Sequence, residues 1–165
     1  HYLRAMSFYN QIVDEKKDLG EIVKAQKYFN ILIKDYPNTE FSVDAEFKLE
    51  LIKEILASKE MYLARFYLDK EKWIPAMNRF KRITTDYNTT IYIEEALHRL
   101  VELNYKLGLT DEAKKYAAIL GYNYQTSEWY EQSYKILKKD YVKISKRENN
   151  KKQNSILKRF KSLFD

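Results

Sequence analysis

The sequence of 165 residues contains no cysteine, three glycines and two prolines. The absence of cysteine excludes disulfides, thiolate zinc sites and cysteine nucleophiles. The scarcity of glycine and proline argues against a β-sandwich or barrel, because these folds need a turn signal about every 8–12 residues. No apolar run reaches the length of about 18 residues that predicts a membrane-spanning helix. With 45% hydrophobic and 33% charged residues, the chain can form a core and a well solvated surface, and the scarcity of glycine and proline favours a nearly all-helical fold.

The net charge of +6 is concentrated near the C-terminus. Residues 135–165 contain 11 Lys and Arg residues against three acidic residues, a net charge of +8, whereas residues 1–134 carry −2. We consider three interpretations of this basic tail: a solvated and partly flexible end, a segment that lies on anionic lipid, or a site for an acidic partner protein. Nucleic acid is not expected as a partner, because the remaining chain is nearly neutral.

Apolar residues recur at helical spacing along almost the whole chain. Glycine, proline and asparagine interrupt this spacing at a few places and so mark the ends of helices. Thr39 or Ser42 is expected to cap a helix of nearly thirty residues, since no glycine or proline follows before Asp69. The predicted helices cover residues 2–14, 21–36, 41–69, 73–87, 91–107, 111–122 and 127–146, with a short amphipathic helix at 155–164.

An internal repeat relates three of these helices. Ala25, Ala76 and Ala113 are each followed seven residues later by Leu or Ile, and a second apolar segment begins sixteen residues before each alanine, at Tyr9, Glu60 and Leu97. This spacing is typical of a degraded tetratricopeptide repeat, in which small residues let two antiparallel helices cross closely.

The distances between the repeats place one insertion. Ala76 and Ala113 are 37 residues apart, near the usual distance of about 34, but Ala25 and Ala76 are 51 apart. The excess is assigned to the long helix 41–69. We therefore predict an all-α fold, a right-handed solenoid of tetratricopeptide helical hairpins with one long inserted helix and a C-terminal capping helix. The side chains expected in its core are Phe29, Leu63, Ala64, Tyr67, Phe80, Leu97, Leu100 and Ala113.

The predicted domain organisation is a solenoid of three repeats over residues 1–146 and a basic, partly flexible tail over residues 147–165. The chain opens inside a segment of helical periodicity that includes Tyr2, Leu3 and Met6. We therefore expect that it is the C-terminal part of a longer protein.

Several segments carry a resemblance to a known family. They are Asp35-Tyr-Pro-Asn-Thr-Glu-Phe, Ala64-Arg-Phe-Tyr-Leu, Ala76-Met-Asn-Arg-Phe, Glu95-Ala-Leu-His-Arg-Leu-Val-Glu, Leu107-Gly-Leu-Thr-Asp-Glu-Ala and Ser127-Glu-Trp-Tyr. Over residues 2–137 the sequence resembles the BamD (ComL) family of tetratricopeptide lipoproteins that assemble outer-membrane β-barrels, in its alphaproteobacterial form. It departs from the family at Asn88, at Gln125 and in the basic tail.

The resemblance implies a non-enzymatic scaffold subunit of the β-barrel assembly (BAM) complex, which helps outer-membrane proteins to fold and insert. The implied partners are a POTRA domain of BamA, other BAM lipoproteins and unfolded outer-membrane proteins. The implied location is the periplasmic face of the outer membrane, with a lipid anchor on the full-length protein. Membrane binding by the basic tail is an expectation from its own residues, since Ile156, Leu157, Phe160, Leu163 and Phe164 can share one helix face opposite Lys158, Arg159 and Lys161. The alternative is a generic tetratricopeptide adaptor that binds a peptide or protein in its concave groove.

The residues themselves predict no catalytic site, no cofactor and no metal. The serines lack a paired histidine and acid, and the scattered glycines form no phosphate loop. Glu94, His98 and Glu102 have the i, i+4 spacing of three potential metal ligands, but no second histidine accompanies them. We interpret His98 as a polar residue on an exposed helix face that lines the groove together with Arg65 and Glu102.

The resemblance implies a partner-binding role for Arg79, with Arg82 and Lys72 near it. Arg79 follows Ala76 by three residues and precedes Phe80, so it is expected at the edge of a buried face with its guanidinium in water. Such a group offers a planar fork to a carboxylate of a partner. The alternative is a solvated arginine that pairs within its own helix.

Fifteen tyrosines allow two interpretations, base stacking or packing between helices, and packing is favoured. Trp129 and Tyr130 are expected to dock the last helix on the last repeat.

The basic tail generates a first prediction. A peptide of residues 155–165 is expected to co-sediment with anionic vesicles and not with neutral ones, because each Lys or Arg near an anionic surface contributes about 1 kcal/mol. Equal binding to both kinds of vesicle, or to neither, would remove the membrane interpretation.

Overall fold

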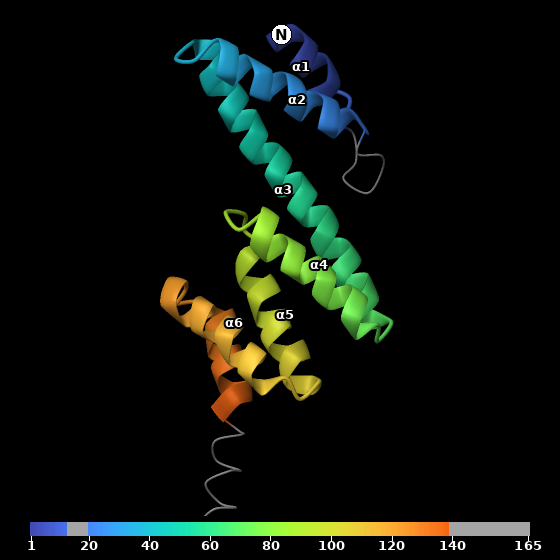
Figure 1. Ribbon diagram of the computed structural model, residues 1–165, viewed down its shortest axis with the longest axis vertical. Helices are drawn as coiled ribbons and strands as arrows, with labels where there is room; N and C mark the ends of the chain where they lie inside the picture. The colour runs from blue at the N-terminus through green and yellow to red at the C-terminus, as the bar shows by residue number, and fades with distance from the viewer. Residues whose placement is uncertain (13–19, 139–165) are drawn as a thin grey trace, which may run out of the picture. The chain divides into compact units, whose positions relative to one another are not determined.

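The computed structural model describes residues 1–12 and 20–138, and every regular element within these two ranges is an α-helix (Figure 1). The chain divides into two compact units, His1–Arg99 and the residues from Leu100 onward. The all-α class predicted from the sequence is confirmed for the described residues. The helices are α1 (Tyr2–Tyr9), α2 (Gly20–Asp35), α3 (Glu40–Asp69), α4 (Trp73–Asp86), α5 (Ile93–Lys106) and α6 (Thr110–Asn123), and residues 128–138 are also helical.

The predicted helices agree with these elements to within about two residues at most ends. The exception is α1, which stops at Tyr9 because Asn10 and Gln11 form a turn. The predicted capping helix is described as far as residue 138. Its end, the helix at 155–164 and the proposed tail at 147–165 lie outside the described residues.

The long helix α3 is continuous over 30 residues. The Ser42 N–H donates to the Thr39 hydroxyl at 3.1 Å, and the Thr39 N–H donates to the Ser42 hydroxyl at 3.0 Å, so both expected residues take part in one capping box. At the other end Glu71 has a positive φ of 55°, which turns the chain back toward α4. At 1.5 Å per residue the helix is about 45 Å long, enough to pack against two different partners.

These two partners are α2 and α4, as Figure 1 shows. The first half of α3 contributes to a core shared with α1 and α2, in which the alanines allow close approach. Aromatic rings fill the wider gaps, with Phe8 stacked on Tyr28 at 5.6 Å between centroids and Tyr9 edge-on to Phe29 at 6.0 Å. The buried members of this core are Ala5, Ile22, Ala25, Phe29, Leu32, Ala45 and Ile52.

The second half of α3 packs on α4 through small and apolar residues. Ala64 and Ala76, predicted to lie at this crossing, are both fully buried, as is Phe80. The prediction that Leu63 and Tyr67 belong to the core is wrong, because both side chains are only partly buried. Neighbouring helical residues point about 100° apart, so a helix that directs Ala64 at its partner leaves Leu63 at the edge of the contact.

Two glycines determine local geometry in the described part of the unit from Leu100 onward. Gly108 has a φ of 79°, which lets the chain reverse between α5 and α6, and the Leu109 N–H donates to the Asn104 carbonyl at 2.8 Å. A Cβ at Gly121 of α6 would lie 2.7 Å from the Tyr130 ring. Residues 128–138 therefore pack against α6 at a glycine, as expected for a docking role of Tyr130.

The α3–α4 crossing generates a second prediction. Ala76→Leu is expected to lower the free energy of unfolding by about 1–3 kcal/mol, because the site has no room for the added methyl and methylene groups. Urea unfolding followed by circular dichroism measures the change. Ala118→Leu on the exposed face of α6 is the matched control, with an expected change of less than about 0.5 kcal/mol. Equal effects of the two substitutions would contradict the packing.

Candidate functional site

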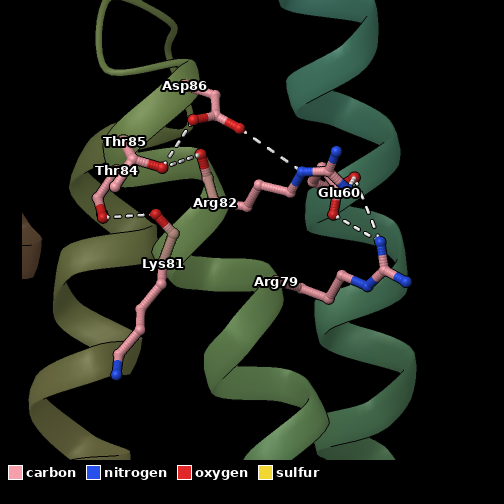
Figure 2. Close-up of polar contacts among 7 residues, drawn as sticks. All are labelled: Glu60, Arg79, Lys81, Arg82, Thr84, Thr85 and Asp86. Carbon is pink, nitrogen blue, oxygen red and sulfur yellow. Dashed lines mark hydrogen bonds and ion pairs between the residues drawn. The ribbon is translucent and has the colours of Figure 1, made fainter.

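A buried carboxylate joins α3 to two arginines of α4 (Figure 2). The Arg79 Nη1 atom lies 3.0 Å from Oε2 of Glu60 and 3.3 Å from Oε1. The Arg82 Nη1 atom lies 3.1 Å from the same Oε1. The Glu60 side chain is only 10% exposed, so both arginines compensate a charge that is largely removed from water.

The sequence positions these three side chains through helical spacing. Arg79 and Arg82 are three residues apart and therefore lie on one side of α4. Glu60 lies on the side of α3 that also carries the buried Ala57 and Ala64, the side that packs on α4. The packing of the two helices thus brings the carboxylate to the arginines.

The two arginines differ in their exposure to solvent. The Arg79 side chain is 33% exposed and the Arg82 side chain 54%. The Arg82 Nε atom also lies 3.5 Å from Oδ2 of Asp86, one helical turn later. Asp86 in turn accepts a hydrogen bond from the Thr85 hydroxyl at 2.9 Å. Each arginine side chain is therefore bound by carboxylates of the protein and is still partly exposed to solvent.

Tyr87, directly after α4, lies close to the same charges. Burial raises the pKa of its hydroxyl, and the charge of Arg82 opposes this shift while those of Glu60 and Asp86 support it. Tyr87 is therefore a neutral phenol at neutral pH and adds no charge to the cluster.

Two of the predicted partner-binding residues lie on one side of α4, and the third is the residue that directly precedes this helix. Arg79 and Arg82 meet at Glu60, whereas Lys72 is exposed at the start of the helix, two turns or about 10 Å from Arg79. We call these three residues the basic strip. The expected position of Arg79 at the edge of the buried face is confirmed. Within this chain Arg79 pairs with Glu60 of α3 and not within its own helix as the alternative interpretation expected, while its contact with a partner stays a prediction.

Glu60 is the residue that sequence analysis missed. The repeat pattern marks it only as a position equivalent to Tyr9 and Leu97. The available signal was its chemistry, because an acidic residue occupied a position that is apolar or aromatic in the other two repeats. A carboxylate at a buried repeat position requires a cation opposite it, and α4 supplies two.

The predicted groove-lining residues have different environments. Arg65 of α3 donates from Nε to Oε1 of Glu95 at 3.1 Å and makes a second contact through Nη2 with Oε2. The hydrogen bond to Glu95 raises the pKa of Arg65. His98 is 1% exposed, so the prediction that it lies on an exposed helix face is wrong. Residues 95–98 of α5 are all buried, and helical periodicity alone did not reveal that so wide a face is covered. Glu102 is partly buried, and its role in a groove stays a prediction.

Two properties of residues 1–12 and 20–138 bear on other classes of function. No group of three or more His, Asp or Glu side chains in these ranges is arranged to hold a metal ion. Within the same residues, no helix combines the length and the hydropathy that crossing a bilayer requires.

Comparison with known proteins identifies the family. A family model described as "YfiO: Outer membrane lipoprotein" matches residues 1–120, which include Glu60 and the whole basic strip. The chain belongs to the YfiO/BamD family. The predicted resemblance and the predicted fold class, an all-α tetratricopeptide-type helical repeat, are therefore confirmed.

Named relatives of the chain are outer membrane protein assembly factors BamD. The protein of Rickettsia prowazekii is 43% identical over 138 residues, 84% of this chain and 55% of the relative. That of Caulobacter vibrioides is 38% identical over 136 residues, covering 82% and 45%, and that of Vibrio cholerae 32% identical over 112 residues, covering 67% and 46%. The first two are alphaproteobacteria, as the sequence predicted. The chain spans about half the length of these BamD relatives.

The buried carboxylate generates a third prediction. Arg79→Glu is expected to lower the free energy of unfolding by about 2–3 kcal/mol, because it replaces the cation at Glu60 with a second carboxylate. Arg82 remains and keeps the cost below that of an entirely unpaired charge. Urea unfolding followed by Trp73 fluorescence in a Trp129→Phe background reports on the α3–α4 pair.

The matched control is Lys81→Glu, which makes the same change of charge on α4. Figure 2 shows the Lys81 side chain directed away from Glu60. Its expected effect is less than about 0.5 kcal/mol. If Arg79→Glu were as stable as Lys81→Glu, the buried pair would be refuted.

Proposed function

We propose that this protein is a non-enzymatic subunit of the BAM complex that binds the periplasmic region of BamA and thereby assists the folding and insertion of outer-membrane proteins. Membership of the YfiO/BamD family supports this role, as do relatives whose names describe assembly factors. The chain spans about half of those relatives, so the activity of the whole protein is inferred from this half.

The location follows from the same family. Its description as an outer membrane lipoprotein supports a position at the periplasmic face of the outer membrane, with a lipid anchor on the full-length protein. Other BAM lipoproteins and unfolded outer-membrane proteins are further proposed partners. The contribution of this subunit is binding rather than covalent chemistry.

The observation that carries the proposal is the basic strip of α4. A guanidinium offers a planar fork of donors that matches a carboxylate, and the strip presents two of them, with an exposed lysine at the start of the same helix. Glu60 restricts both guanidinium groups before any partner arrives, so less conformational freedom is lost on binding. A POTRA domain with an acidic side chain opposite the strip is the proposed occupant.

The groove-binding adaptor is less well supported. It depended on three polar side chains offered to a bound peptide. His98 is buried, so one of the three side chains is not offered to a peptide, whereas Arg65 is half exposed and paired with Glu95 much as Arg82 is paired with Glu60. The basic strip of α4 is therefore the better candidate for contact with a protein.

The binding test generates a fourth prediction. Arg82→Gln and Lys72→Gln are each expected to weaken the binding of purified BamA periplasmic domains from the same organism by about 1–2 kcal/mol, or about 5- to 30-fold in Kd. Glutamine removes the charge without introducing a carboxylate beside Glu60. Arg79→Glu is unsuitable here because it would disturb the fold.

Lys81→Gln is the matched control, since it removes one positive charge from α4 outside the strip. Isothermal titration calorimetry measures each Kd, and circular dichroism verifies the helical content. If the parent protein does not bind these domains, the proposed function is wrong. If Lys81→Gln weakens binding as much as Arg82→Gln, only net charge matters and the assignment of the strip is wrong.

A further inference from the structure

Two carboxylates, those of Glu60 and Asp86, contact the arginines of α4 (Figure 2). They differ in burial and in their distances to the guanidinium nitrogens. Glu60 is nearly buried and lies within 3.0–3.3 Å of nitrogens from both arginines. Its removal would leave two cations close together, and its exchange for a ligand would require a partner to reach between α3 and α4. Glu60 is therefore a fixed part of the cluster.

Asp86 has the opposite properties. Its side chain is 50% exposed and its distance to Arg82 Nε is 3.5 Å, so the pair is of the half-exposed i, i+4 type that contributes little to stability. Asp86 is also the last residue of α4, where the helix dipole disfavours a negative charge. Both features make the contact between Asp86 and Arg82 easy to displace.

The charges of the cluster balance only when both carboxylates are counted. Arg79 and Arg82 carry two positive charges, and Glu60 and Asp86 carry two negative ones. If Asp86 leaves Arg82, one positive charge becomes available on a half-exposed guanidinium that Glu60 still holds in place. A carboxylate of a partner restores the balance, whereas a neutral or basic surface does not.

We infer that Asp86 is an internal competitor, which occupies on Arg82 the position that a carboxylate of the protein partner takes, while Glu60 remains bound and positions the arginine. This inference rests on the proposed function. It identifies Arg82, rather than Arg79, as the arginine that exchanges its ligand on binding. It also makes Asp86 a determinant of specificity, because only a partner that brings its own carboxylate displaces it without loss.

The test is Asp86→Asn, which removes the charge but keeps the size and an oxygen that accepts from Thr85. Binding of purified BamA periplasmic domains is measured by calorimetry at about 50 mM salt, where surface charges are weakly screened. The expected result is a Kd about three- to tenfold lower, or about 0.7–1.4 kcal/mol. A gain in affinity cannot arise from damage to the fold, which distinguishes competition from a structural role.

Two further variants make the test specific. Glu131 and Lys135 form another exposed i, i+4 pair, with 3.8 Å between Oε2 and Nζ. Glu131→Gln removes one negative charge from this pair and is expected to leave the Kd unchanged. In an Arg82→Gln background, Asp86→Asn is expected to give no gain, since the cation for which both carboxylates compete is gone.

The possible results distinguish the role of Asp86 from the proposed binding of BamA. If Asp86→Asn binds more tightly, and the gain disappears in the Arg82→Gln background, the role of Asp86 as an internal competitor is supported. An unchanged or higher Kd for Asp86→Asn, or an equal gain from Glu131→Gln, overturns it while the proposed function stands. If the parent chain does not bind BamA at all, the proposed function falls and the competitor falls with it.

Discussion

The buried charge of Glu60 is the constraint on which the arrangement of α3 and α4 depends. The alanines at positions 57, 64 and 76 let these helices approach closely, and this approach removes the carboxylate between them from water. A desolvated carboxylate is costly unless cations and hydrogen-bond donors surround it. Arg79 and Arg82 meet this requirement and are in turn restricted by it. One electrostatic requirement of the fold therefore determines where two positive groups are presented at the surface.

This dependence assigns different roles to two arginines of α4 and to the lysine that caps the helix. Arg79, one-third exposed and bonded twice to Glu60, belongs mainly to the fold. Arg82, half exposed and shared between a buried and an exposed carboxylate, is the group best able to exchange one ligand for another. Lys72 contributes an exposed charge two turns away. A partner with acidic side chains would thus find a partly preorganised surface rather than a set of freely moving side chains.

Periodicity predicted the helices well because it reports directly on which side of each helix is apolar, and the repeated alanines predicted the close crossings. The same reasoning failed for Leu63, which lies one residue away from the true contact, and for His98, which packs in a face wider than the apolar residues indicated. It also missed the role of Glu60, because an ion pair between helices depends on the relative rotation of both. The spacing of residues within one helix gives no information about that rotation. The resemblance to the family therefore pointed to Arg79, but only the structure shows that Arg79 and Arg82 share the buried carboxylate of Glu60.

The measurement that tests this account most directly is a double-mutant cycle between Glu60→Gln and Arg79→Gln. Urea unfolding of the four proteins, followed by Trp73 fluorescence in a Trp129→Phe background, gives the coupling free energy between the two side chains. A buried, charge-assisted pair predicts a coupling of about 1.5–3 kcal/mol. A coupling below about 0.5 kcal/mol would show that Glu60 does not hold Arg79, and would contradict the preorganised basic strip.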